Sequence, residues 1–162
     1  KLPVADMPEG KFAESMEGES VALQGIANST VAEGEAKDGK HYLKVAAGDI
    51  PGILIDNRTG ETDKNYTVSV WVKADTVTEG KVTIRAAKNF MKPEYENYEA
   101  YECVTGLKTN KATTVDLSKA GDWVQIQSKI TVAAGKISEV AIGSPDEQPL
   151  AYLLDHIEIT PR

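Results

Sequence analysis

The sequence is poor in the residues that build covalent and metal cross-links. Its 162 residues include one cysteine, Cys103, and two histidines, His41 and His156. A single cysteine excludes an internal disulfide bond and any metal site made of several cysteines. So few histidine and cysteine side chains also disfavour zinc. The chain is nevertheless long enough to bury a sizeable hydrophobic core.

Long hydrophobic runs and excess positive charge are also missing. No apolar run approaches the roughly 20 residues that a transmembrane helix needs, so we expect no insertion into a membrane. The chain has 18 Lys and Arg against 25 Asp and Glu, which gives a formal net charge of -7. Nucleic acids and anionic membrane surfaces attract basic proteins, so neither is an expected partner. Neutral ligands and cations remain open.

No signal peptide is recognisable, and the chain begins abruptly at Lys1. We interpret this start as that of a processed or cloned piece of a longer exported protein, whose location is extracellular, periplasmic or on the cell surface. Other domains of such a chain would be candidate partners. Because the sequence shows no internal repeat, linker or low-complexity stretch, we predict one domain over residues 1–162.

Nearly every candidate element alternates with period two and is bounded by Gly, Pro or Asp, as is typical of strands. Residues 26–38 and 116–121 could each hold a helical turn at most. Many short antiparallel strands favour a β-sandwich or a barrel. The predicted strands are Phe12–Met16, Ser20–Gln24, His41–Ala47, Ile53–Asp56, Tyr66–Ala74, Lys81–Ala87, Thr113–Leu117, Trp123–Val132, Ile137–Ile142 and Ala151–Thr160.

Three predicted strands carry an apolar row on one face and an unusual polar row on the other. The apolar rows are led by Val68, Val70 and Val72, with parallel rows starting at Val82 and Val124. A sheet face that only meets water does not need Trp, Arg and Gln together. The residues that stand out on the polar faces are Trp71, Arg85, Gln125 and Gln127.

The last predicted strand places a carboxylate among aliphatic residues. Strict alternation puts Asp155 on the same face as Leu153, Ile157 and Ile159. A buried carboxylate is costly unless it is paired, hydrogen-bonded or bound to a metal. Asp155 therefore needs a specific explanation.

Three stretches resemble the jelly-roll carbohydrate-binding modules, the broad group that includes families 4, 9, 16 and 22. They are YTVSVWVKA (66–74) with the following VTIR (82–85), then Trp123 through the strand to VAI (140–142), and YLLDHI (152–157). The family's last strand usually has a second Asp where this chain has His156, and the usual Asn-Gly-Phe-Glu opening is missing. The resemblance, over about residues 41–160, implies an all-β, antiparallel β-sandwich of the jelly-roll type.

The resemblance also implies a structural calcium ion at Asp155, because the family's final-strand Asp binds one. Calcium takes several oxygen ligands, so a second carboxylate is expected nearby. Glu14 is the candidate, since it shares a strand face with Phe12 and Met16. The alternative is that Asp155 caps a turn or accepts backbone N–H groups.

A sugar site is implied on a concave sheet face or a loop rim. Trp71 could stack against the apolar face of a sugar ring, while Trp123, at a strand start, is better explained by packing. Arg85, Gln125 and Gln127 could bind sugar hydroxyls, because guanidinium groups donate hydrogen bonds and amides both donate and accept them. The alternative is an ordinary solvated sheet face.

Aromatic residues make up only 6% of the chain, yet they cluster in residues 89–102 (NFMKPEYENYEAYE). Loop tyrosines combine a rigid apolar ring with a hydrogen-bonding tip, which suits a binding surface. The alternative is a loop that packs its own aromatic residues against the sandwich edge. The candidates for sugar contact are Phe90, Tyr95, Tyr98 and Tyr101.

These patterns favour non-catalytic binding of an oligo- or polysaccharide. One alternative is a structural or protein-interaction domain of a larger surface protein. Another is a glycan-cleaving enzyme of the jelly-roll type that uses Glu99 and Glu102, but the paired-carboxylate strand motif of such an enzyme is missing. Asp155 and His156 are adjacent and would point to opposite faces, so they cannot form a dyad.

Overall fold

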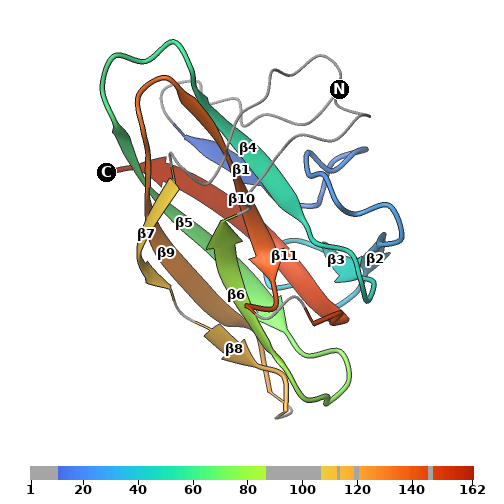
Figure 1. Ribbon diagram of the computed structural model, residues 1–162. Helices are drawn as coiled ribbons and strands as arrows, with labels where there is room; N and C mark the ends of the chain where they lie inside the picture. Colours follow the sequence, from blue (N-terminus) through green and yellow to red (C-terminus); the bar gives the residue numbers. More distant parts are fainter. Residues whose placement is uncertain (1–10, 87–106, 113, 119–120, 146–147) are drawn as a thin grey trace.

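The computed structural model describes residues 11–86, 107–112, 114–118, 121–145 and 148–162 (Figure 1). These residues form two stacked β-sheets. They contain no helix that is long and apolar enough to cross a membrane. The described strands are β1 (Phe12–Glu14), β2 (Thr30–Glu33), β3 (His41–Val45), β4 (Gly52–Asn57), β5 (Lys64–Lys73), β6 (Lys81–Ala86), β7 (Leu107–Ala112), β8 (Thr114–Asp116), β9 (Val124–Val132), β10 (Lys136–Gly143) and β11 (Tyr152–Pro161).

All pairings between the described strands are antiparallel. The seven-stranded sheet has the order β2-β3-β11-β5-β9-β7, with β1 paired to β11 in addition. The four-stranded sheet has the order β4-β10-β6-β8. The antiparallel β-sandwich expected from the sequence is therefore confirmed.

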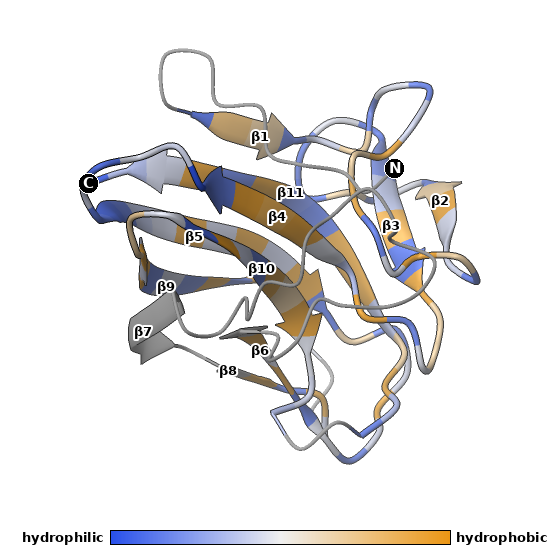
Figure 2. Ribbon diagram, turned by 45° about the horizontal axis from the view of Figure 1, so that its top comes forward, coloured by the Kyte–Doolittle hydropathy of each residue, from blue (hydrophilic) through white to orange (hydrophobic). Residues whose placement is uncertain are grey.

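The hydrophobic core lies between the two sheets and follows the alternation of the strands. Val68, Val70 and Val72 of β5 are fully buried and belong to the same core cluster as Ile53 and Ile55 of β4 in the other sheet. Hydrophobic residues follow one another along β4 and β10 (Figure 2). Burial of these aliphatic rows from both sheets is what holds the two layers together.

Two edge strands have no counterpart in the sequence expectations. β2 lies in the stretch expected to hold at most a helical turn, and the polar β7 was not expected at all. Each lies at an edge of the seven-stranded sheet, and β2 is mostly exposed, so its period-two signal is weak. Conversely, residues 20–24 form no strand, only an isolated bridge from Gln24 to Gly52.

Candidate functional site

Each sheet has an outward face that turns away from the core. We call them the seven-stranded face and the four-stranded face. Residues directly opposite one another on paired strands share a face, so the register shows which side chains lie together. The two faces divide the residues that the sequence placed in one sugar site.

The seven-stranded face brings three of the predicted residues together. Trp71 of β5 pairs with Gln125 of β9, and Ser69 pairs with Gln127 two residues further along. Both glutamines are exposed, whereas Trp71 is half-buried. This row is polar and open to solvent on β9, as the sequence predicts.

Trp71 is already covered by another part of the chain. The ammonium Nζ of Lys37 lies 4.3 Å from the centroid of the Trp71 ring, in a cation–π contact. We call residues 35–41 the cover loop, because its carbonyl at Glu35 also accepts a hydrogen bond from Trp123 Nε1 (3.2 Å). One face of the Trp71 ring is therefore occupied by Lys37.

Trp123 has structural contacts on two sides. Besides its bond to the cover loop, its ring meets the edge of Tyr42 at a centroid distance of 6.0 Å and an angle of 68°. Such edge-to-face pairs stabilise packing. The structural interpretation of Trp123 fits these contacts.

Asp155 does not lie on the apolar face that strict alternation predicts. Register along β11 shifts between Asp155 and Glu158, where His156 takes a left-handed backbone conformation with φ of 45°. This β-bulge returns Ile157 to the core side, whereas Asp155 pairs with Trp71 on the seven-stranded face. The prediction that Asp155 shares a face with Ile157 was wrong, because one extra residue reverses the alternation.

Asp155 is nevertheless fully buried. Its Oδ2 accepts a hydrogen bond from the backbone N–H of Asp38 in the cover loop (3.0 Å). Its Oδ1 is buried and has no hydrogen-bond partner among the described residues. Burial raises the pKa of Asp155, against the opposing effect of nearby backbone N–H groups. A desolvated carboxylate oxygen without a partner is compatible with a cation ligand.

Glu14 is buried, but it does not form a pair with Asp155. It lies opposite Ile157 of the core, and its two oxygens accept backbone N–H groups of Ala22 (2.6 Å) and Met16 (2.9 Å). Both carboxylate oxygens thus have local partners. The expectation that Glu14 is the neighbouring carboxylate has no support from this geometry.

Glu17 is the carboxylate whose charge contributes to the raised pKa of Asp155. Its oxygens accept the backbone N–H groups of Lys40 (3.0 Å) and His41 (2.7 Å). The hydrogen bond with the His41 ring, followed by that with Lys40, lowers the pKa of Glu17 to about 2. Among the described residues, no three His, Cys, Asp or Glu side chains form a group that could hold a metal ion.

The four-stranded face carries a carboxylate that sequence reasoning missed. Glu139 of β10 lies opposite Leu54, between the core residues Ser138 and Val140, so it faces outward. It is half-buried, and the side-chain amide of Gln24 donates a hydrogen bond to its Oε2. The signal was present in the sequence, because Glu139 is the one acidic residue in the predicted strand Ile137–Ile142.

Gly52 leaves the space in which the Glu139 carboxyl group lies. A Cβ atom at residue 52 would stand 3.3 Å from Cδ of Glu139 and 3.1 Å from the carbonyl oxygen of Val140. Gln24 bridges to the same residue through two backbone hydrogen bonds. Gly52 thus positions both partners of the carboxyl–amide pair, and Oε1 of Gln24 is left buried without a partner among the described residues.

Small residues form the floor of this face. Ala141 pairs with Gly52 on one side, and Gly143 pairs with Thr83 on the other. Ala141 is 2% exposed and Thr83 is 6% exposed, and Leu54 and Ile137 on the same side are fully buried, so the centre of this face is covered and Glu139 is its partly accessible polar group. At the end of the strands an open cavity of about 410 Å³ follows, beside Lys81 and Asp116.

Arg85 lies in β6 of the four-stranded sheet, opposite Ala141. Trp71, Gln125 and Gln127 lie in the other sheet. The prediction that these four residues share one face was therefore wrong for Arg85. β5 and β6 are consecutive in the sequence but enter different layers of the sandwich.

The aromatic segment falls outside the described residues. It contains Phe90, Tyr95, Tyr98 and Tyr101, and also Glu99 and Glu102. In sequence it joins β6 of the four-stranded sheet to β7 of the seven-stranded sheet. Its predicted contacts with sugar stay predictions.

Comparison with known proteins gives a likeness of fold. No protein-family model matches the sequence, and a search of curated proteins finds no match. Among solved structures, the CBM22-1 xylan-binding domain from Paenibacillus barcinonensis Xyn10C aligns with 99% of this chain and 97% of its own length, at 19% identity and a TM-score of 0.59.

Two longer structures are similar at the same identity of 19%. The tandem CBM22-1-CBM22-2 domains of Paenibacillus barcinonensis Xyn10C give a TM-score of 0.58 over 98% of this chain and 46% of theirs. The CBM22-1-GH10 modules of the Clostridium thermocellum endo-1,4-beta-D-xylanase 10B, complexed with xylohexaose, give 0.53 over 99% of this chain and 28% of theirs. The resemblance to the jelly-roll carbohydrate-binding modules is thus confirmed at the level of fold.

Proposed function

We propose that this protein binds glycan chains without cleaving them, and that the four-stranded face is the binding surface. The observation that carries the proposal is the hydrogen-bonded pair of Glu139 and Gln24 over Gly52, on an outward sheet face. The likeness of fold to xylan-binding domains supports the same function.

The chemistry of the pair suits a sugar. A carboxylate accepts hydrogen bonds from hydroxyl groups, and charge-assisted bonds of this kind are stronger than neutral ones. The amide of Gln24 holds one oxygen of Glu139 in place, so little side-chain freedom is lost when a ligand binds.

The aromatic part of the site would come from the segment that follows β6. Ala86, the last residue of β6, pairs with Val140, the neighbour of Glu139. The last described residue of β6 thus lies beside the proposed surface. We therefore propose that the rings of this segment stack on the sugar, and that Arg85 contributes donors. The candidate rings remain Phe90, Tyr95, Tyr98 and Tyr101.

A titration against soluble polysaccharides tests the function, with xylan and xylohexaose as first probes because the similar structures are named for them. We expect measurable binding by the wild type and a loss of at least tenfold in Glu139→Gln, since a charge-assisted bond contributes about 1.5–3 kcal/mol. A folded wild type that binds no polysaccharide would instead favour a structural or protein-interaction domain.

The same titration distinguishes the two faces. The double variant Gln125→Ala, Gln127→Ala removes the exposed amides of the seven-stranded face. We expect it to bind like the wild type. Loss of binding in this variant, with Glu139→Gln unaffected, would move the site to the seven-stranded face.

The non-catalytic part of the proposal has its own test. We expect no release of reducing ends from xylan on prolonged incubation. Release that disappears in Glu99→Gln or Glu102→Gln would establish the enzymatic alternative.

We also propose a structural calcium ion at Asp155, with the partnerless Oδ1 as its ligand atom. Such an ion would tie β11 to the cover loop, which already bonds the other oxygen of Asp155. A cation bound only by the folded state raises its stability, so EDTA should lower the melting temperature. An unchanged melting curve after EDTA treatment, in both wild type and Asp155→Ala, would count against the ion.

Export to the cell surface or the extracellular medium, as part of a longer chain, belongs to the same proposal. Polysaccharides are too large to enter a cell, and the similar structures include a module joined to another module in one chain. Recovery of the native protein from the cell exterior, with its apparent mass on a gel, is the direct measurement.

A further inference from the structure

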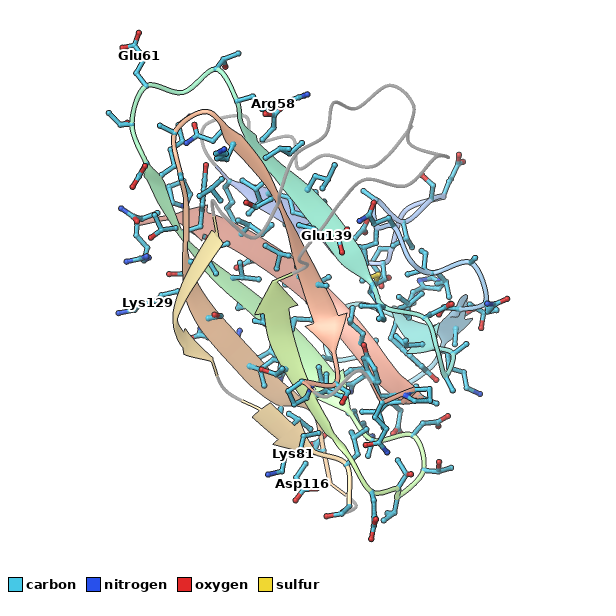
Figure 3. All side chains as sticks on the ribbon, in the orientation of Figure 1. Arg58, Glu61, Lys81, Asp116, Lys129 and Glu139 are labelled. Atoms are coloured by element: carbon cyan, nitrogen blue, oxygen red, sulfur yellow. The ribbon has the colours of Figure 1, made fainter. Side chains whose placement is uncertain are left out.

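The open cavity beside Lys81 and Asp116 has no role in the binding proposed at Glu139. It lies where β6 begins and where β8 and β10 end, and its volume is about 410 Å³. Figure 3 shows Lys81 and Asp116 at one end of the four-stranded sheet, away from Glu139. The buried residues Ala141 and Thr83 lie between the two places, so the cavity is a separate feature of the surface.

Three segments of the chain form the cavity wall. They are the residues at the start of β6 and just before it (79–81), the end of β8 with the turn after it (116 and 118), and the loop after β10 (144, 145 and 148). Every segment contributes polar side chains. The polar lining residues are Glu79, Lys81, Asp116, Ser118, Ser144 and Gln148.

Hydrogen bonds hold these three segments together. The backbone N–H of Leu117 donates to the carbonyl oxygen of Gly80 (2.9 Å), and that of Thr78 donates to the carbonyl oxygen of Leu117 (3.0 Å). The side-chain amide of Gln148 donates to the carbonyl oxygen of Glu79 (3.0 Å), which joins the third segment to the first. A wall that is fixed before binding loses less conformational entropy when a ligand arrives.

Gly80 sets this wall on the hydrophobic core. Its φ of 146° lies in the region that favours glycine, and a Cβ atom there would stand 2.6 Å from Cδ2 of Leu150. Leu150 is buried and belongs to the core cluster. The cavity therefore rests on the packed interior of the sandwich.

The lining combines hydrogen-bond donors with acceptors. Lys81 presents an ammonium donor, and the Asp116 carboxylate comes from the position opposite it on the paired strand. Oδ1 of Asp116 accepts the backbone N–H of Ser118 (2.9 Å), which orients the carboxylate. Neighbouring hydroxyl groups of a sugar ring both donate and accept, so they can bond to a carboxylate and an ammonium group at the same time.

Charge and size narrow the class of ligand. Two carboxylates against one ammonium group give the lining a net negative charge, which disfavours a uronate, sulfate or phosphate. Among the described residues, no three His, Cys, Asp or Glu side chains gather there to hold a metal ion instead. Small-molecule sites typically span about 300–1,000 Å³, so about 410 Å³ is near the lower end of that range. The lining therefore favours one or two uncharged sugar units.

We propose that the cavity is a second glycan site, independent of Glu139, which binds one or two uncharged sugar units through hydrogen bonds. The inference rests on the proposed function for the class of ligand and on the cavity for the place. Its consequence is that one protein molecule has two contact sites for a polysaccharide. Occupation of both by one long chain raises the apparent affinity, and occupation by two chains cross-links them.

The experiment isolates the cavity by removing the other site first. In a Glu139→Gln background, Lys81→Gln and the control Lys129→Gln are titrated with xylobiose and with cellobiose. Lys129 of β9 lies on the seven-stranded face, opposite Thr67 (Figure 3), and both lysines are exposed, so neither substitution should unfold the protein. We expect Glu139→Gln alone to retain weak disaccharide binding. Lys81→Gln should weaken that binding about tenfold, as for a lost charge-assisted hydrogen bond, and Lys129→Gln should leave it unchanged.

Other results separate this inference from the proposed function. A folded Glu139→Gln protein that binds neither disaccharide has no second site, while polysaccharide binding by the wild type would keep the proposed function. Residual binding that is equal in the Lys81→Gln and Lys129→Gln proteins lies outside the cavity and also overturns the inference. Disaccharide binding by the wild type that is lost in Lys81→Gln and unchanged in Glu139→Gln would support the cavity and end the proposed role of Glu139.

Discussion

The two outward faces of the sandwich differ in what occupies them. The seven-stranded face is closed over Trp71 and Asp155 by the cover loop, which makes a cation–π contact and a backbone hydrogen bond there. On the four-stranded face, the carboxylate of Glu139 accepts a hydrogen bond from the side-chain amide of Gln24 over a glycine. A polar face that is already bonded to its own chain has little left to offer a ligand. The residues with the more conspicuous chemistry therefore have contacts within the chain, and the proposed binding surface on the other sheet rests on Glu139.

Among the substitutions on the seven-stranded face, removal of the Asp155 carboxylate should give the largest loss of stability. Asp155→Ala leaves the backbone N–H of Asp38 without its acceptor and should lower the free energy of unfolding by about 2 kcal/mol. Because Asp155 is far from Glu139 in the other sheet, glycan affinity of the folded variant should not change. Chemical denaturation and glycan titration measure the two quantities. A parallel loss of affinity would show that the faces are not independent.

A methyl group at residue 52 should lower glycan affinity more than stability, which is the reverse of the effect expected for Asp155→Ala. In Gly52→Ala, the new Cβ would crowd Cδ of Glu139 at 3.3 Å and push the carboxyl group aside. We expect glycan affinity to fall about fivefold, near 1 kcal/mol, with a smaller loss of stability. Gly121→Ala is the matched control, since a Cβ there meets nothing within 4 Å. If Gly52→Ala binds as well as the control, Glu139 is not a ligand contact.

Acid should weaken the hydrogen bonds by which Glu17 holds the cover loop. Its hydrogen bond with His41 holds the folded-state pKa at about 2, against an ordinary value of 4.5. Ionised Glu17 therefore contributes stability above pH 4.5, and this contribution is lost as the pH falls from 4.5 towards 2. Between about pH 5 and about pH 2.5, the melting temperature should fall less in Glu17→Gln than in wild type. Identical acid sensitivity in both proteins would mean that Glu17 does not anchor the loop.

The smallest effect should follow from uncovering Trp71. Lys37→Ala removes the ammonium group from the ring and should cost about 0.5 kcal/mol of stability. Tryptophan fluorescence should report the change in exposure, while glycan affinity stays constant. An increase in affinity would identify Trp71 as a sugar platform that Lys37 normally occupies, and would reverse the assignment of the two faces.

The central strands were predictable because their burial follows a simple period. Val68, Val70 and Val72 alternate with polar residues, so both the strand and its inward side followed from the sequence. The edge strands β2 and β7 were not predictable in this way, because a strand that pairs on one side only needs no apolar row. Val124 shows the same limit, since it continues an apolar row but is 47% exposed at the start of β9.

The candidate site was harder to predict, because it depends on which strands share a sheet. Trp71 and Arg85 lie on consecutive strands, and nothing in their local pattern shows that those strands enter different layers. The pair of Gln24 and Glu139 joins residues 115 positions apart. A single chain without an alignment carries no signal for such a contact. The odd carboxylate in an apolar strand is a usable signal, and it marks Glu139 in the same way as Asp155.

The inserted residue at His156 has a consequence for how this protein tolerates sequence change. The segments of β11 before and after it alternate in opposite phase, so Leu154 and Ile159 both reach the core although their positions differ by an odd number. A deletion at position 156 would bring the two segments into one phase and would keep Asp155 outward and Ile157 and Ile159 inward, because Asp155 would then directly precede Ile157. Replacement by glycine, which accepts a positive φ freely, would keep both phases. Position 156 should therefore tolerate both a change of residue type and its own deletion, since neither turns a core side chain of β11 outward.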